Sequence, residues 1–163
     1  MLKKNIVLGL IFCIFAAFPL SAANVSFLVM ETGLRQTSPS VRHSVMWENG
    51  LMEIFFEFGH IVSNAPMLRV FEEPEGGLPS DAEMDYEAAR SGGMDFFVIA
   101  IINYPARGNN PRPQNVVLRL FSTESEKMLH EQTFSDTRSR TQKEEYDFIK
   151  GAIAEFAASL NRR

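Results

Sequence analysis

Hydrophobic residues in this chain gather in continuous runs and in helical steps, and the longest run covers residues 94–104. It follows the glycine pair Gly92–Gly93 and ends at Pro105, and its middle part, residues 96–102, holds only apolar side chains. An apolar run with backbone breakers at both ends predicts a strand that is buried on both faces. Such a strand needs a covering layer on each side, and the other elements are predicted to supply these layers.

Four further runs predict strands because they are short, apolar or alternating, and bounded by turn residues. They are residues 25–30, 60–63, 115–121 and 127–134. The last two are separated by the turn Thr123–Glu126, so they are predicted to form a hairpin. One face of the returning strand is predicted to carry Met128, His130, Gln132 and Phe134.

Three segments place apolar residues at steps of three and four, which predicts amphipathic helices. They are residues 40–58, 80–91 and 141–160. The first is predicted to start from Ser40 as its N-cap and to stop at Gly59. The other two open with the capping-box spacing, in which each of two side chains bonds the other residue's backbone amide. The pairs are Ser80 with Glu83, and Thr141 with Glu144.

The element order is therefore βαβαβββα, which predicts an α/β fold with a mixed five-stranded sheet and helices packed on its faces. Two right-handed crossovers followed by a meander are most simply arranged in the strand order 2-1-3-4-5. In that order the two crossover helices lie on opposite faces of the sheet. Residues 67–79 are rich in proline and glycine and predict an irregular connection.

The first 23 residues have the layout of a secretory signal peptide. Lys3 and Lys4 precede the apolar stretch 6–20, and Ser21 and Ala23 are small residues at the −3 and −1 positions. The alternative is an uncleaved anchor, but this apolar stretch is shorter than the roughly 20 residues of a spanning helix. We therefore expect cleavage after about Ala23. Residues 24–163 are then expected to form a single α/β domain without stable membrane insertion.

Composition narrows the classes of function for residues 24–163. The whole chain has a formal charge of −4, and removal of Lys3 and Lys4 makes it −6, which argues against a nucleic-acid partner. The only cysteine is Cys13, inside the signal segment. A disulfide framework, a thiol nucleophile and a cysteine-ligated metal are therefore not expected in the mature chain.

No catalytic residue, metal ligand or cofactor-binding residue is predicted. The three histidines, His43, His60 and His130, have none of the spacings of a metal site. Glu53 and Glu57 are one helical turn apart and are interpreted as a solvated helix face. The nucleophile pattern Gly-x-Ser-x-Gly and the nucleotide pattern Gly-x-Gly-x-x-Gly do not occur.

Two surfaces are candidate sites. The loop 105–114 places two arginines among prolines and asparagines on an acidic chain, so it is a candidate for partner binding, although a solvated connection would have the same composition. Its candidate residues are Arg107, Asn109, Asn110 and Arg112. The second candidate is a cleft at the strand ends, where open α/β sheets bind ligands. Its candidate residues are Glu31, Thr32, His60 and Asn64.

Two segments carry a resemblance to known envelope proteins. Residues 85–99 resemble a passage in the amino-terminal domain of the Tol-system translocation protein, the curli-secretion lipoprotein and the outer-membrane activators of penicillin-binding proteins. Residues 116–127 are similar to the next strand and turn of these proteins. The lipobox of the lipoprotein members is missing here. The resemblance implies a non-enzymatic domain for protein docking or assembly, and it assigns no site residue.

The sequence thus predicts an exported, periplasmic binding or assembly module of the cell envelope that is not an enzyme and docks a protein partner. The identity of that partner and the oligomeric state stay open. Two alternatives also stay open. One is a small envelope hydrolase that uses His60 at the strand ends, and the other is a carrier of a small apolar ligand between the sheet and the first helix.

Overall fold

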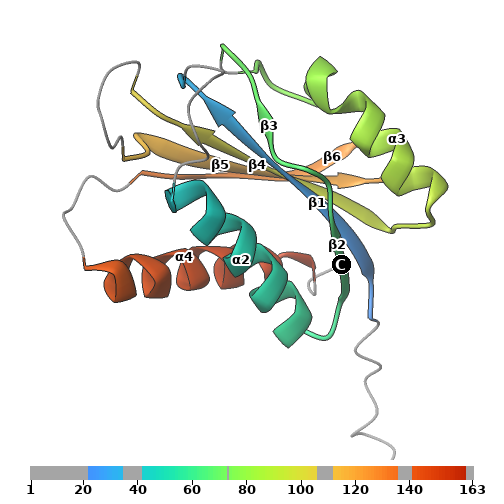
Figure 1. Cartoon of the computed structure of the whole chain (residues 1–163). Coiled ribbons are helices and arrows are strands. Elements are labelled where there is room, and N and C mark those ends of the chain that lie inside the picture. Colours follow the sequence, from blue (N-terminus) through green and yellow to red (C-terminus); the bar gives the residue numbers. More distant parts are fainter. Residues whose placement is uncertain (1–21, 35–41, 73, 106–111, 136–140, 161–163) are drawn as a thin grey trace, which may run out of the picture.

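The computed structural model describes residues 22–34, 42–72, 74–105, 112–135 and 141–160. Its strands are β1 (Asn24–Thr32), β2 (Ile61–Asn64), β3 (Leu68–Arg69), β4 (Phe96–Asn103), β5 (Asn115–Ser122) and β6 (Met128–Phe134). Its helices are α2 (Arg42–Glu57), α3 (Glu83–Ser91) and α4 (Gln142–Ala157), and the 3-10 turn η1 (Ser80–Ala82) precedes α3. The strands form one open mixed sheet with helices on both faces (Figure 1).

The sheet has the predicted strand order. Its path is β2-β1-β4-β5-β6, where β1 pairs in parallel with β2 and β4, and β5 and β6 continue as an antiparallel meander. This is the order 2-1-3-4-5 of the five predicted strands, so the α/β prediction is confirmed. The predicted central strand, β4, is buried along its whole length apart from its first residue.

The prediction of an irregular connection at residues 67–79 is wrong at its start, because Leu68–Arg69 forms the sixth strand, β3. It pairs with Met30 and Glu31 of β1, on the same side as β2. The pairing register between β1 and this edge shifts by one residue from β2 to β3, which is the signature of a bulge. Pro66 lies in the interruption, and because proline has no backbone N–H it cannot donate to the ladder there.

Alternate strand residues point to opposite faces, so the sheet has two apolar layers. Helices α2 and α4 cover one face, and α3 covers the other (Figure 1). The layer under α2 and α4 takes Phe27, Val98, Ala100 and Leu118 from the strands, whereas the layer under α3 takes Leu28, Ile99 and Phe121. The two crossover helices, α2 and α3, thus lie on opposite faces, as predicted.

Three of the four residues predicted on one face of β6 pack beneath α2 and α4. The prediction is wrong for Met128, which pairs with Phe121 of the α3 layer because the register shifts between Leu120 and Phe121. The rings of Phe134 and Trp47 have centroids 6.1 Å apart, and the rings of His130 and Phe156 have centroids 5.4 Å apart. Gln132 donates a hydrogen bond to Glu155 on α4 at 2.7 Å.

Two of the predicted helix ends are confirmed. After α2, Gly59 has a φ of +85°, and the bonds His60 N to Phe55 O and Gly59 N to Phe56 O close the helix in the Schellman pattern. At the start of α4, Thr141 and Glu144 form the full capping box. The predicted N-cap of the first helix, Ser40, lies outside the described residues.

The predicted capping box of Ser80 and Glu83 is wrong. Ser80 lies inside the 3-10 turn η1, and Ala82 occupies the N-cap position of α3 without a side-chain capping bond. A side chain caps a helix when its own backbone is extended. Here Pro79 has the extended conformation, with φ −64° and ψ 141°, so the turn begins one residue too early for Ser80 to act as a cap.

Candidate functional site

The carboxyl ends of β1 and β4 meet at one edge of the sheet, and polar side chains replace the apolar ones there. The parallel register pairs Glu31 with Ile102 and Thr32 with Asn103. Glu31, Thr32 and Asn103 are all buried, with 1%, 4% and 5% of their surface exposed. Since buried polar groups need hydrogen-bond partners, the identity of these partners decides what the edge can do.

Thr32, Asn103 and Asn115 form a chain of side-chain hydrogen bonds across three strands. Thr32 Oγ1 donates to Asn103 Oδ1 at 2.6 Å, and Asn103 Nδ2 donates to Asn115 Oδ1. The backbone N–H of Gln114 also donates to Asn103 O at 2.7 Å. This series of hydrogen bonds therefore fixes both ends of the β4–β5 connection to the end of β1.

Glu31 is paired with Arg69, which β3 brings beside it. Arg69 Nε donates to Glu31 Oε2 at 2.9 Å, and the pair also forms a salt bridge through Nη2. A carboxylate this deeply buried is costly without a cation, so the short strand β3 has a clear role at this edge.

The connection after β4 is held to α2 by Tyr104. Its hydroxyl lies 2.7 Å from Ser44 Oγ, and both side chains are buried. Burial raises the pKa of Tyr104 far above its usual value, so its phenol stays protonated at physiological pH. Gly33, with a φ of +75°, lies so close that a Cβ there would come within 2.2 Å of Tyr104 O.

The structure brings together only part of the predicted strand-end cleft. Glu31 and Thr32 are neighbours at the carboxyl edge, but Asn64 is level with Phe27 in the sheet and donates to Glu48 on α2 at 2.9 Å. His60 precedes β2 and lies at the opposite, amino edge, where its Nδ1 accepts a hydrogen bond from Ala23 N at 3.3 Å. The grouping is wrong for two reasons. The strand β2 runs parallel to β1, so the residue before its start, His60, lies at the amino edge, and the edge strand does not end at Asn64 but resumes as β3. Whether Glu31 or Thr32 binds anything stays a prediction.

Arg112 lies at the same end of the molecule as the carboxyl edge, between the N-terminal ends of α2 and α4. It lines a small cavity of about 130 Å³ together with Arg42, His43, Thr141 and Glu145, among others. Arg112 and Arg42 are both exposed. The other candidates of this loop, Arg107, Asn109 and Asn110, lie outside the described residues.

His43 is the titratable group of this cavity. Burial lowers its pKa, the nearby charge of Glu145 opposes that shift, and Arg112 and Arg42 lower the pKa further. The Nδ1 atom of His43 lies 3.6 Å from Glu145 Oε1. At neutral pH this histidine is therefore uncharged, and the positive charge of the cavity comes from the two arginines.

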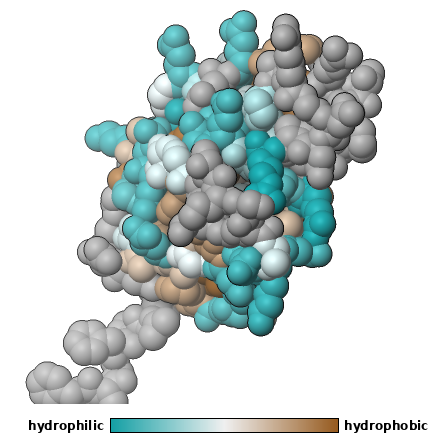
Figure 2. Space-filling view, turned by 90° about the vertical axis from the view of Figure 1, so that its left-hand side faces the viewer, coloured by the Kyte–Doolittle hydropathy of each residue, from teal (hydrophilic) through white to brown (hydrophobic). Residues whose placement is uncertain are grey.

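Figure 2 shows this end of the molecule, which is the left-hand side of Figure 1. Hydrophilic side chains cover much of the described surface there, and hydrophobic residues appear in smaller patches between them. The described part of this face therefore shows no large apolar patch.

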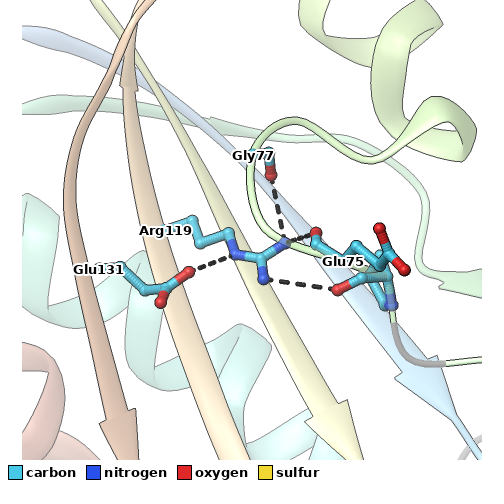
Figure 3. Close-up of polar contacts among 5 residues, drawn as sticks. Glu75, Gly77, Arg119 and Glu131 are labelled. Carbon is cyan, nitrogen blue, oxygen red and sulfur yellow. Dashed lines mark hydrogen bonds and ion pairs between the residues drawn. The ribbon is translucent and has the colours of Figure 1, made fainter.

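Sequence reasoning missed a second polar centre, around Arg119 on β5. This side chain is 5% exposed and lies on the α3 face of the sheet. It donates to Glu131 Oε2 at 2.7 Å and to the carbonyls of Glu75 and Gly77 at 2.9 and 3.1 Å (Figure 3). Arg119 thus fastens the loop before η1 onto the sheet. A charged residue in the middle of an otherwise apolar predicted strand was the available signal.

In the described part of the chain, no group of three or more His, Cys, Asp or Glu side chains is placed to hold a metal ion. Among the same residues, no helix is both long and apolar enough to cross a membrane. The polar groups of the carboxyl edge bond to one another. Their arrangement can therefore hold the loop ends in place. Toward solvent, this end of the molecule presents the exposed charges of the Arg112 cavity.

Neither a family model nor a curated protein sequence matches this chain. Solved structures do resemble its fold. A PelC dodecamer from Paraburkholderia phytofirmans is 15% identical with a TM-score of 0.46, over 82% of this chain and 86% of that one. The LpoB C-terminal domain from Escherichia coli is 12% identical with a TM-score of 0.43, over 76% and 89%.

TolB from Acinetobacter baumannii is also similar, at 11% identity and a TM-score of 0.41. The match covers 87% of this chain but 29% of the TolB chain. The resemblance seen in the sequence therefore reappears among solved structures, with TolB and LpoB among them. It concerns the fold, and we transfer no activity, partner or site residue from it.

Proposed function

We propose that this chain is an exported, non-enzymatic binding or assembly module of the cell envelope, and that it docks a protein partner through the Arg112 cavity. The observation that carries the proposal is the exposed pair Arg42 and Arg112 in one cavity, on a chain whose residues 24–163 have a formal charge of −6. A local positive site on an acidic protein selects an acidic patch on its partner, and the rest of the acidic surface repels that patch from other positions.

The buried polar bonds behind the cavity support this role. The hydrogen bonds that link Thr32, Asn103 and Asn115 fix both ends of the connection that contains Arg112. The contact of Tyr104 with Ser44 also ties the start of this connection to α2. A binding surface on a rigid base loses less conformational entropy when its partner docks. The signal-peptide layout of residues 1–23 supports export, to the periplasm where the cell has an outer membrane.

The two alternatives find less support. The hydrolase would need a base at the strand ends, but His60 lies at the opposite edge and its Nε2 is buried without a hydrogen-bond partner among the described residues. The carrier would need space between the sheet and α2, but Trp47, Leu51 and Phe55 fill that layer and are almost completely buried. Native mass spectrometry of the purified protein, with a co-purified apolar ligand as the positive result, would reinstate the carrier.

The proposal is tested by in-cell photocrosslinking of the full chain, with a photoreactive residue at position 112 and mass spectrometry of the adducts. We expect one dominant envelope protein as the adduct, and no such adduct from position 75, which is also exposed. Charge reversal of Arg42 to Glu, with the probe kept at 112, should weaken the adduct by about tenfold or more, because like charges then face each other.

The matched control is Lys127→Glu, which reverses an exposed charge on the β5–β6 turn and keeps Arg42, with the probe again at position 112. We expect this variant to give the adduct at the original level. Equal adducts from positions 112 and 75, or equal losses in Arg42→Glu and Lys127→Glu, would overturn the docking site.

A further inference from the structure

The start of β1 is tied to the start of β4 by a reciprocal set of hydrogen bonds between Asn24 and Asp95. Asn24 N donates to Asp95 Oδ2 at 2.7 Å, and Asn24 Nδ2 donates to the same oxygen at 3.3 Å. In return, Asp95 N donates to Asn24 O at 2.8 Å. One carboxylate oxygen thus faces the main-chain nitrogen of the residue that follows the predicted cleavage point.

The fold fixes this geometry. The parallel register pairs Val25 with Phe96, so the residues before them, Asn24 and Asp95, necessarily lie side by side. On the other side of Asp95, the N–H and the hydroxyl of Thr123 both donate to its carbonyl oxygen, at 3.2 and 3.1 Å. The Asp95 backbone is therefore held from two directions, and its carboxylate is oriented before any change at Asn24.

We propose that the leader is removed between Ala23 and Asn24, and that the new α-ammonium group of Asn24 forms an ion pair with the Asp95 carboxylate. The inference rests on the export in the proposed function. An endopeptidase of the export pathway adds one water across the peptide bond, so that the C–N bond breaks. The carbonyl carbon of Ala23 gains the hydroxyl, and the Asn24 nitrogen gains the hydrogen and, at neutral pH, one further proton.

Cleavage converts an existing hydrogen bond from a neutral amide to the carboxylate into one in which both partners are charged. The Asn24 N–H donates as a neutral amide in the uncut chain, and hydrogen bonds with two charged partners are shorter and stronger than neutral ones. The cut also removes two contacts of Ala23, namely its donation to His60 Nδ1 and the acceptance by its carbonyl of the Ile61 N–H at 3.0 Å. The ion pair compensates for these losses at the end of the same strand.

Other charged groups surround the new terminus. His60 from the start of β2, Arg90 from α3 and Glu124 from the β5–β6 turn line the same open cavity of about 640 Å³ as Asp95. Arg90 is already paired with Glu126 at 2.9 Å. Burial lowers the pKa of His60, so at neutral pH it adds no positive charge beside the ammonium. Asp95 is therefore the partner for the terminal charge.

The ion pair predicts a pH dependence with a definite sign. An adjacent carboxylate raises the pKa of an amine above its unfolded value, which is about 7.7–8.0 for a chain terminus. The stabilisation is therefore complete below that pH, and it is lost as the pH rises through the higher folded-state pKa.

The test uses the full chain, exported with its own leader and purified from the envelope compartment. Intact mass spectrometry gives the first residue, and an NMR titration of the terminal amine, labelled by reductive ¹³C-methylation, gives its pKa. We expect a chain that begins at Asn24. We also expect an amine pKa that is about 0.5 unit higher than in Asp95→Asn, and unchanged in the control Asp81→Asn, which removes a carboxylate elsewhere.

The outcomes separate this inference from the proposed function. A chain that begins at Asn24 with equal amine pKa values in the wild type and Asp95→Asn overturns the ion pair only. A chain that begins at Ala23 overturns the assignment, since its amine would face His60 Nδ1 instead. If Asp95→Asn fails to accumulate, a wild-type amine pKa no higher than that of an unstructured peptide overturns the ion pair. A chain that keeps residues 1–23 overturns both this inference and the export.

Discussion

Arg119 shows how one residue can hold two distant parts of this chain together. Its guanidinium group binds the side chain of Glu131 on the neighbouring strand and the carbonyls of a loop more than 40 positions earlier. Without this side chain, those carbonyls would lie over the sheet without their donor. The loss of several bonds from one charged donor costs more than the loss of an average hydrogen bond.

We predict that Arg119→Ala lowers the free energy of unfolding by about 2 to 4 kcal/mol, because it unpairs the loop carbonyls and leaves a space in the sheet face. The control Glu131→Gln keeps the bonds to the loop, and since Glu131 is 40% exposed it should cost about 1 kcal/mol or less. Urea unfolding of both variants measures the difference. Equal losses would show that the loop contacts contribute nothing.

At this scale the sequence identifies single residues but not their partners. Glu31 and Thr32 are correctly expected at the carboxyl edge, because they end an apolar run. Arg69 and Asn103 are missed, since their contacts with Glu31 and Thr32 span 38 and 71 positions. No local pattern encodes such a pair, and only the strand register decides which two polar residues meet.

At the scale of elements, α3 and α4 open with the same sequence spacing but with different structures. Thr141 has an extended backbone and caps α4, whereas Ser80 lies within a 3-10 turn and caps nothing. The difference arises from Pro79, which takes the extended conformation that a capping residue needs. The spacing therefore predicts a cap only where the Ser or Thr itself, and not the residue before it, has the extended backbone.

We predict that Thr141→Ala destabilises the protein by about 1 kcal/mol, through the loss of the bond from the Glu144 amide. Ser80→Ala is its matched control and should change stability by less than about 0.5 kcal/mol. Thermal unfolding followed by circular dichroism compares the two. A larger effect from Ser80→Ala than from Thr141→Ala would contradict the capping geometry.

The elements themselves follow well from hydrophobic periodicity, because each buries a face that the pattern marks. The exception is β3, whose two residues are too few to show a period. It pairs with the part of β1 that extends beyond β2, and its Arg69 forms a salt bridge with the buried Glu31. Both partners lie outside residues 68–69, so the local sequence does not reveal them.

At the scale of the whole molecule, stability should depend on pH through buried histidines. Burial lowers the pKa of both His43 and His60. The unfolded chain therefore takes up protons near pH 6.5, while the folded chain does so only at lower pH. The folded state consequently loses stability as the pH falls through about 6.5.

We predict that the free energy of unfolding decreases from pH 7.5 to pH 5.5, and that His60→Phe shows a smaller decrease over the same range. Phenylalanine keeps an aromatic ring next to Phe55, whose ring centroid lies 5.9 Å from that of His60. Urea titrations at a series of pH values measure both slopes. Identical slopes in the wild type and His60→Phe would exclude His60 as a source of the dependence.

The strand β1 is the first element of the sheet to be synthesised, yet it lies in the interior of the sheet. Its neighbour β4 is 71 positions away, and β4 in turn needs β5 as its other neighbour. Contacts between such distant segments slow folding, because a long loop must close before they form. The growing chain therefore cannot complete its sheet until residues beyond 120 have been made. If the chain is exported as proposed, a translocation channel that takes it up before that point receives it unfolded.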